Sequence, residues 1–67
     1  MRIIILHDTS ATTFYINVDA IEYFEDTLGE QGEFLFSTVY LRGGKSLLCD
    51  ETSHEIVQLI RIESARS

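Results

Sequence analysis

The dipeptide Gly43-Gly44 constrains the fold of this chain most, because it separates two β-rich runs, residues 34–42 and 45–49. Two consecutive glycines supply the two positive φ angles of a type I′ turn, the tight connection that suits a β-hairpin. Such a turn would pair Arg42 with Lys45, Tyr40 with Leu47 and Val39 with Leu48. The sequence therefore predicts a hairpin with apolar residues on both faces, of which a single helix can cover only one.

Two runs near the amino terminus also have the pattern of strands. Residues 2–7 contain the apolar run Ile3 to Leu6, which predicts a strand covered on both faces. Residues 12–18 alternate apolar and polar side chains instead. Because residues 8–11 form a polar turn between them, we expect the two runs to pair as a hairpin.

A corner precedes the next predicted strand. Asn17 and Asp19 bracket it, and side chains of these two types bond to nearby backbone and favour turns over ladders. Residues 21–25 then have the composition of a short strand. The glycines and acidic residues of 27–33 predict an exposed loop after that strand.

The carboxyl-terminal part contains a helix start signal. Thr52 and Glu55 have the spacing of a capping box, with Thr52 at the N-cap. Apolar residues follow on one helical face, namely Ile56, Val57, Leu59 and Ile60. Ile62 lies off that stripe, and the tail is expected to fray from about residue 63. Together these elements predict one small α+β domain over residues 1–67, an antiparallel β-meander of four to five strands with one C-terminal α-helix.

The chain is short, and its sequence predicts no internal cross-link that would stabilise the fold. A domain of 67 residues buries only about 60% of the surface that it exposes when unfolded, and Cys49, the one cysteine, cannot form an internal disulfide. A second copy or another protein is therefore expected to stabilise it, and we predict a two-fold homodimer. The expected interface residues are Tyr15, Tyr23, Phe24, Tyr40 and Ile62.

The charge balance indicates the kind of partner. The chain has eleven acidic residues and five basic ones, which gives a formal net charge of -6. Nucleic acids and anionic membranes are bound mainly through clustered Lys and Arg, whereas the basic residues here are scattered. The longest apolar run is too short to cross a membrane or to form the core of a signal peptide. The composition predicts a cytoplasmic protein that binds protein, with no nucleic-acid partner and no membrane insertion.

Chemically active side chains precede the predicted helix, namely Cys49, Asp50, Glu51 and His54. A thiol near an imidazole is the arrangement of a nucleophile with its base, and the same residue types bind zinc. Each also has a structural explanation, since small thiols fill cores and acidic groups are favoured at a helix N-terminus. His7-Asp8 is interpreted as a strand end and a turn. We therefore expect no catalytic residue, no cofactor site and no metal site.

Turn, core and capping residues follow one another in a particular order along most of the chain. They are Phe14-x-x-Asn17-x-Asp19-x-Ile21-Glu22-x-x-Glu25, then Val39-x-Leu41-x-Gly43-Gly44-Lys45-x-Leu47-Leu48, then Glu51-Thr52-x-x-Glu55-Ile56. This order resembles that of the small FlbD/SwrD-like family of bacterial flagellar and motility proteins, over about residues 12–62. The resemblance implies a non-enzymatic accessory role in motility, with no catalytic residues.

A second, looser resemblance suggests an alternative. The stretch from Val18 to Glu25, with the later hairpin and helix, is similar to the first half of a LytTR-type DNA-binding domain. This resemblance implies a small transcriptional regulator in place of a protein-interaction module.

Overall fold

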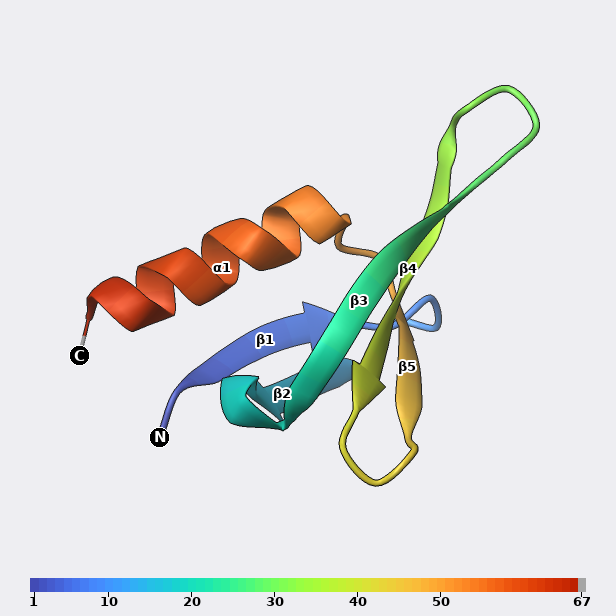
Figure 1. Ribbon diagram of the computed structural model, residues 1–67. Coiled ribbons are helices and arrows are strands. Elements are labelled where there is room, and N and C mark those ends of the chain that lie inside the picture. Colours follow the sequence, from blue (N-terminus) through green and yellow to red (C-terminus); the bar gives the residue numbers. More distant parts are fainter. Residues whose placement is uncertain (67) are drawn as a thin grey trace.

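The computed structural model describes residues 1–66, which form two antiparallel sheets and one helix (Figure 1). In chain order the elements are β1 Ile3–His7, β2 Thr13–Asn17, the 3-10 turn η1 Val18–Ala20, β3 Ile21–Leu28, β4 Phe34–Leu41, β5 Ser46–Cys49 and α1 Ser53–Ala65. β1 pairs with β2, and the other sheet has the order β3-β4-β5. The predicted α+β class, with five antiparallel strands and a C-terminal helix, is confirmed, and the strands are divided between two sheets.

The first hairpin, β1–β2, has one covered face. Ile4 and Leu6 of β1 are buried, whereas Ile5 and His7 are exposed. The prediction that this strand is covered on both faces is therefore wrong. A two-stranded sheet that packs one face against the rest of a small molecule leaves its other face open, so the consecutive isoleucines alternate between inside and outside.

The corner between the two sheets is built by Asn17 and Asp19. The Asn17 side-chain oxygen accepts a hydrogen bond from the Asp19 N–H at 3.0 Å and caps η1. The Arg2 guanidinium binds the Asp19 carboxylate, and the Arg42 N–H donates to the Ala20 carbonyl at 2.9 Å. The corner therefore links β2 to β3 and is also tied to the amino terminus and to the end of β4.

The β3–β4 hairpin is longer than the sequence predicts. Thr27 and Leu28, expected in a loop, pair with Phe36 and Phe34, and the loop spans only residues 29–33. A register shift between these two pairs marks a β-bulge. Aromatic partners on β4 extend the ladder past the point where local composition favours a turn, and the hairpin projects beyond the rest of the molecule (Figure 1).

The turn that closes the β4–β5 hairpin, between the paired residues Leu41 and Lys45, has three residues and not two. The Leu41 N–H donates to the Lys45 carbonyl at 2.8 Å, so Arg42, Gly43 and Gly44 form the loop, and both glycines have positive φ. The predicted two-residue turn is wrong because the Arg42 N–H faces β3, where the corner residue Ala20 accepts it. That N–H is consequently unavailable for pairing with Lys45.

This longer loop shifts the β4–β5 register by one residue from the predicted one. Val39 lies opposite Leu47, and Thr38 lies opposite Leu48. A slip of one residue exchanges the two faces of a strand. Leu47 consequently packs against the core, and Leu48 lies on the opposite side of the sheet.

Helix α1 begins where the sequence predicts. The Glu55 N–H donates to Thr52 Oγ1 at 3.1 Å and the Thr52 N–H donates to the Glu55 carboxylate at 2.9 Å, which completes the capping box. The helix continues to Ala65, so it includes the first part of the tail that the sequence predicts to fray. The Arg2 guanidinium donates to Ser64 Oγ at 3.0 Å and links the last helical turn to the amino terminus.

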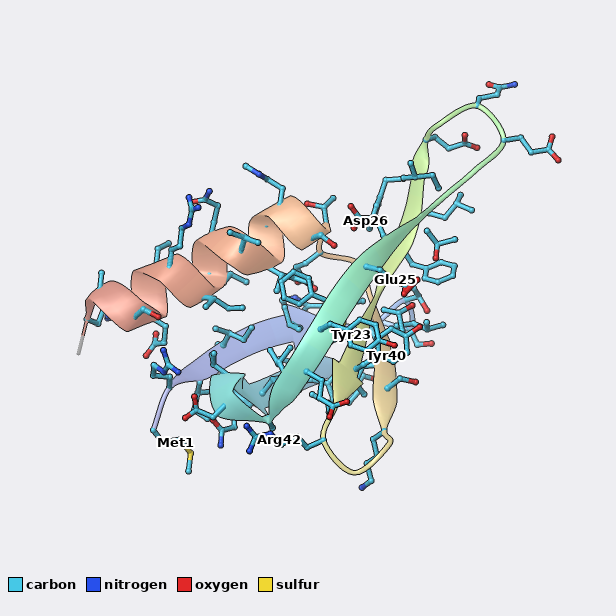
Figure 2. All side chains as sticks on the ribbon, viewed as in Figure 1. Met1, Tyr23, Glu25, Asp26, Tyr40 and Arg42 are labelled. Carbon is cyan, nitrogen blue, oxygen red and sulfur yellow. The ribbon has the colours of Figure 1, made fainter. Side chains whose placement is uncertain are left out.

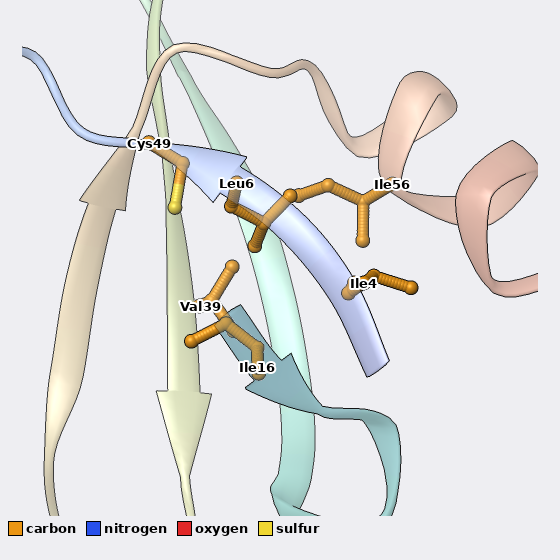
Figure 3. Close-up of a cluster of buried hydrophobic side chains, with 6 residues drawn as sticks. All are labelled: Ile4, Leu6, Ile16, Val39, Cys49 and Ile56. Carbon is orange, nitrogen blue, oxygen red and sulfur yellow. The ribbon is translucent and has the colours of Figure 1, made fainter. Parts of the chain in front are cut away.

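The core lies between the two sheets and the helix (Figure 3). Its buried apolar side chains are Ile4, Leu6, Ile16, Val39, Cys49 and Ile56. Ser37 is also fully buried, and its hydroxyl donates to the Glu51 carbonyl at 2.7 Å, so that this polar group is satisfied. Each of the three layers contributes to one small cluster, and the ends of the longer elements extend past it.

Candidate interaction surface

One face of the β3-β4-β5 sheet points away from the core. Phe24, Val39 and Leu47 form a cross-strand row that packs with the core cluster. Because successive residues of a strand alternate between faces, the rows on either side of this one lie on the opposite surface. We call that surface the outer sheet face, and its residues are Tyr23, Glu25, Thr38, Tyr40, Ser46 and Leu48.

Two tyrosines on the outer sheet face are stacked (Figure 2). The ring centroids of Tyr23 and Tyr40 are 4.3 Å apart, and the ring planes differ by 19°. Tyr23 is 54% exposed, and Leu48, on the other edge strand of the sheet, is 46% exposed. Exposed tyrosine and leucine side chains on one flat surface are typical of a site that binds another protein.

The polar groups of this face complement its apolar ones. Desolvation and, after it, the negative charge of Glu25 raise the pKa of the Tyr40 hydroxyl above its ordinary value. That hydroxyl therefore remains protonated at neutral pH and can donate a hydrogen bond. The Glu25 carboxylate supplies an acceptor on the same surface, while Thr38 is shielded by its neighbours and is nearly buried.

The five predicted interface residues do not form one surface. Tyr23 and Tyr40 lie together on the outer sheet face, but Phe24 faces the other way and packs against the core. Tyr15 is exposed on β2, opposite Ile5, and Ile62 is exposed on α1. Two of the five therefore belong to this candidate surface.

Leu48 belongs to the outer sheet face, although sequence reasoning did not include it. The predicted register places Leu48 opposite Val39, and therefore on the same face as Val39, which is buried in the structure. The signal that would have found it is the third loop residue, Arg42, whose N–H bonds to the corner at Ala20. That bond involves residues far apart in the sequence and has no local signature.

A second feature is an open pocket of about 390 Å³ between β1 and α1, lined by Ile5, His7, Glu51, Glu55, Gln58 and Leu59. The Glu51 carboxylate accepts the His7 N–H at 2.9 Å and lies 2.6 Å from His7 Nδ1. Burial alone would raise the pKa of Glu51, but the hydrogen bonds from His7 outweigh it and the pKa lies below its ordinary value. The pair fixes one orientation of the imidazole and ties β1 to the segment before the helix.

This geometry differs from the two groups of chemically active residues considered in the sequence, His7-Asp8 and the segment from Cys49 to His54. His7 pairs with Glu51 and not with its neighbour Asp8, whose carboxylate accepts backbone N–H groups of its own turn. Cys49 is fully buried, and burial, followed by nearby carboxylates, raises the pKa of its thiol to about 11. His54 is exposed in the first turn of α1. A buried, protonated thiol is a poor nucleophile, so Cys49 acts as a core residue.

Across residues 1–66, no three His, Cys, Asp or Glu side chains are grouped so that they could hold a metal ion. No helix in this part of the chain is long and apolar enough to cross a membrane. Comparisons of the chain with protein-family models, with curated proteins and with solved structures find no match.

Proposed function

We propose that the protein is a non-enzymatic, cytoplasmic interaction module that associates with a second copy of itself through the outer sheet face. The stacked pair Tyr23 and Tyr40 is the observation that supports it. Both rings lie on the side of the sheet opposite the core, and Leu48 of β5 lies on the same face, one cross-strand row away. The resemblance to FlbD/SwrD-like proteins suggests motility as the process that such a module would serve.

A second copy fits this face because the face is self-complementary. Glu25 interacts with the Tyr40 hydroxyl within the chain, but a carboxylate can accept further hydrogen bonds, so a two-fold axis can place it against the Tyr23 hydroxyl of the other copy. Apolar contact between the two faces would also supply the burial that a chain of 67 residues lacks on its own.

Light scattering after gel filtration, at micromolar concentration, tests the proposal. We expect the wild type to have the mass of a dimer, and Tyr23→Ser and Leu48→Ser to have the mass of a monomer. Tyr15→Ser is the matched control, because Tyr15 is an exposed tyrosine on the other sheet. A wild-type monomer whose unfolding does not depend on concentration would show that the outer sheet face is not a self-association site.

A further inference from the structure

The distal part of the β3–β4 hairpin forms an arm that the rest of the chain does not cover. We call residues 26–36 the acidic arm. The pairing of β4 with β5 ends at Ser37, so in the described chain residues 34–36 have no strand beside them on that edge. The molecule measures 40 × 25 × 21 Å, and its radius of gyration of 11.9 Å exceeds the value of about 11 Å expected for a compact chain of this length.

The acidic arm exposes large apolar side chains. Leu28 is 56% exposed and Leu35 is 49% exposed, and neither packs with the core cluster. Leu28 lies opposite Phe34 across the hairpin, and Leu35 lies between Phe34 and Phe36 along β4. If the arm did no more than carry an exposed turn, exposed leucines on both of its strands would have no role.

The charge of the arm has one sign. Asp26, Glu30 and Glu33 lie on it, and the sequence has no lysine or arginine between Arg2 and Arg42. Arg42 lies near the opposite end of the hairpin from the projecting tip (Figures 1 and 2). The arm therefore carries three carboxylates and no lysine or arginine, on the same hairpin end as the exposed Leu28 and Leu35.

Several hydrogen bonds hold the arm in one conformation. The Gly29 N–H donates to the Glu33 carbonyl at 2.7 Å, and the Gln31 N–H donates to the Glu33 carboxylate at 3.0 Å, which closes the tip. At the base, the Ser53 N–H donates to the Asp26 carboxylate at 2.8 Å and links the arm to the start of α1. A surface that is ordered before binding loses less entropy when a partner docks.

We propose that the acidic arm binds a short cationic segment of another protein, in which lysine or arginine alternates with apolar residues. An extended segment of this kind could add as a strand beside residues 34–36, with basic side chains facing the carboxylates and apolar ones facing Leu28 and Leu35. A second copy of this chain fits less well, because it carries a net charge of -6. Its turn offers only two basic residues, Arg42 and Lys45, and the two glycines between them supply no alternation of basic with apolar side chains.

Fluorescence anisotropy with a labelled peptide that alternates lysine and valine tests this proposal on the full chain. We expect binding that weakens with added salt, and no comparable binding of peptides that alternate glutamate and valine or lysine and serine. Glu30→Lys and Leu28→Ser should each weaken binding by about tenfold.

Two control variants separate the arm from general effects. Glu22→Lys makes the same charge change at the core end of β3, and Ile62→Ser removes an isoleucine that is as exposed as Leu28, at 56%. Both should bind within about twofold of the wild type. Absence of wild-type binding would overturn the proposal, as would an equal loss in Glu22→Lys and Glu30→Lys. Loss of peptide binding in Tyr23→Ser would instead place the peptide site on the outer sheet face. The role of that face in self-association is tested separately, by the mass of the protein in solution.

Discussion

Replacing Ile56 by alanine should remove a large part of the stability of this protein. Ile56 is the buried residue of α1, fully enclosed in the cluster with Leu6 and Val39, and it joins the helix to both sheets. Truncating a buried isoleucine to alanine typically costs about 2–5 kcal/mol, from lost transfer free energy and the cavity that remains. A chain of 67 residues has a total unfolding free energy of about 3–10 kcal/mol.

Urea unfolding followed by circular dichroism, at one fixed protein concentration, measures this loss. Ile62→Ala is the matched control, because Ile62 is on the same helix but exposed, and it should change the unfolding free energy by less than about 0.5 kcal/mol. Should Ile56→Ala not fold at all, Ile56→Val still tests the argument, with an expected loss of about 0.5–1.5 kcal/mol. Equal losses at the two positions would refute the packing of α1 through Ile56.

Three further predictions concern single positions. Thr52→Ala should lower the unfolding free energy by about 1 kcal/mol through loss of the N-cap hydrogen bond, and an unchanged urea midpoint would contradict the capping role. Gly43→Ala should cost about 1–3 kcal/mol in the same assay, because its φ of 89° strains any side chain, and a neutral result would mean that the loop adopts another conformation. Because the pKa of Glu51 is lower in the folded state than in the unfolded state, its stabilising contribution is present above the unfolded pKa and is lost as pH falls through the folded pKa. Urea unfolding over a range of acidic pH should show a shallower loss for Glu51→Gln than for the wild type.

Local signals in the sequence predicted the elements that depend on near neighbours. The capping box needs only Thr52 and Glu55, which lie within one helical turn, and the corner needs only Asn17 and Asp19. Each motif is a side chain bonded to backbone a few residues away, so its residues are sufficient to indicate it. The alternation in residues 12–18 also predicts β2, because the two-residue period of a strand can be recognised within a short segment.

The errors arose where distant residues compete for one backbone group. The N–H of Arg42 bonds to Ala20 across the sheet, and this bond lengthens the glycine loop and shifts the register of β5. His7 likewise bonds to Glu51, although Asp8 is its neighbour in the chain. Neither choice has a local signature, so the sequence predicts the wrong partner for Leu48, Val39 in place of Thr38, and gives no sign of the pocket beside His7.

Unequal strand lengths explain why so small a protein carries two separate uncovered surfaces. β3 and β4 each have eight residues, whereas β5 has four and each strand of the first hairpin has five. The shorter elements and the helix cover only one face of the long hairpin, and only at the end near the corner, where Ile21, Phe24 and Val39 pack with the core. The opposite face keeps Tyr23 and Leu48 exposed, and the distal part keeps Leu28 exposed. These side chains lie outside the core cluster and are only about half buried, and we propose that binding accounts for their presence on both surfaces.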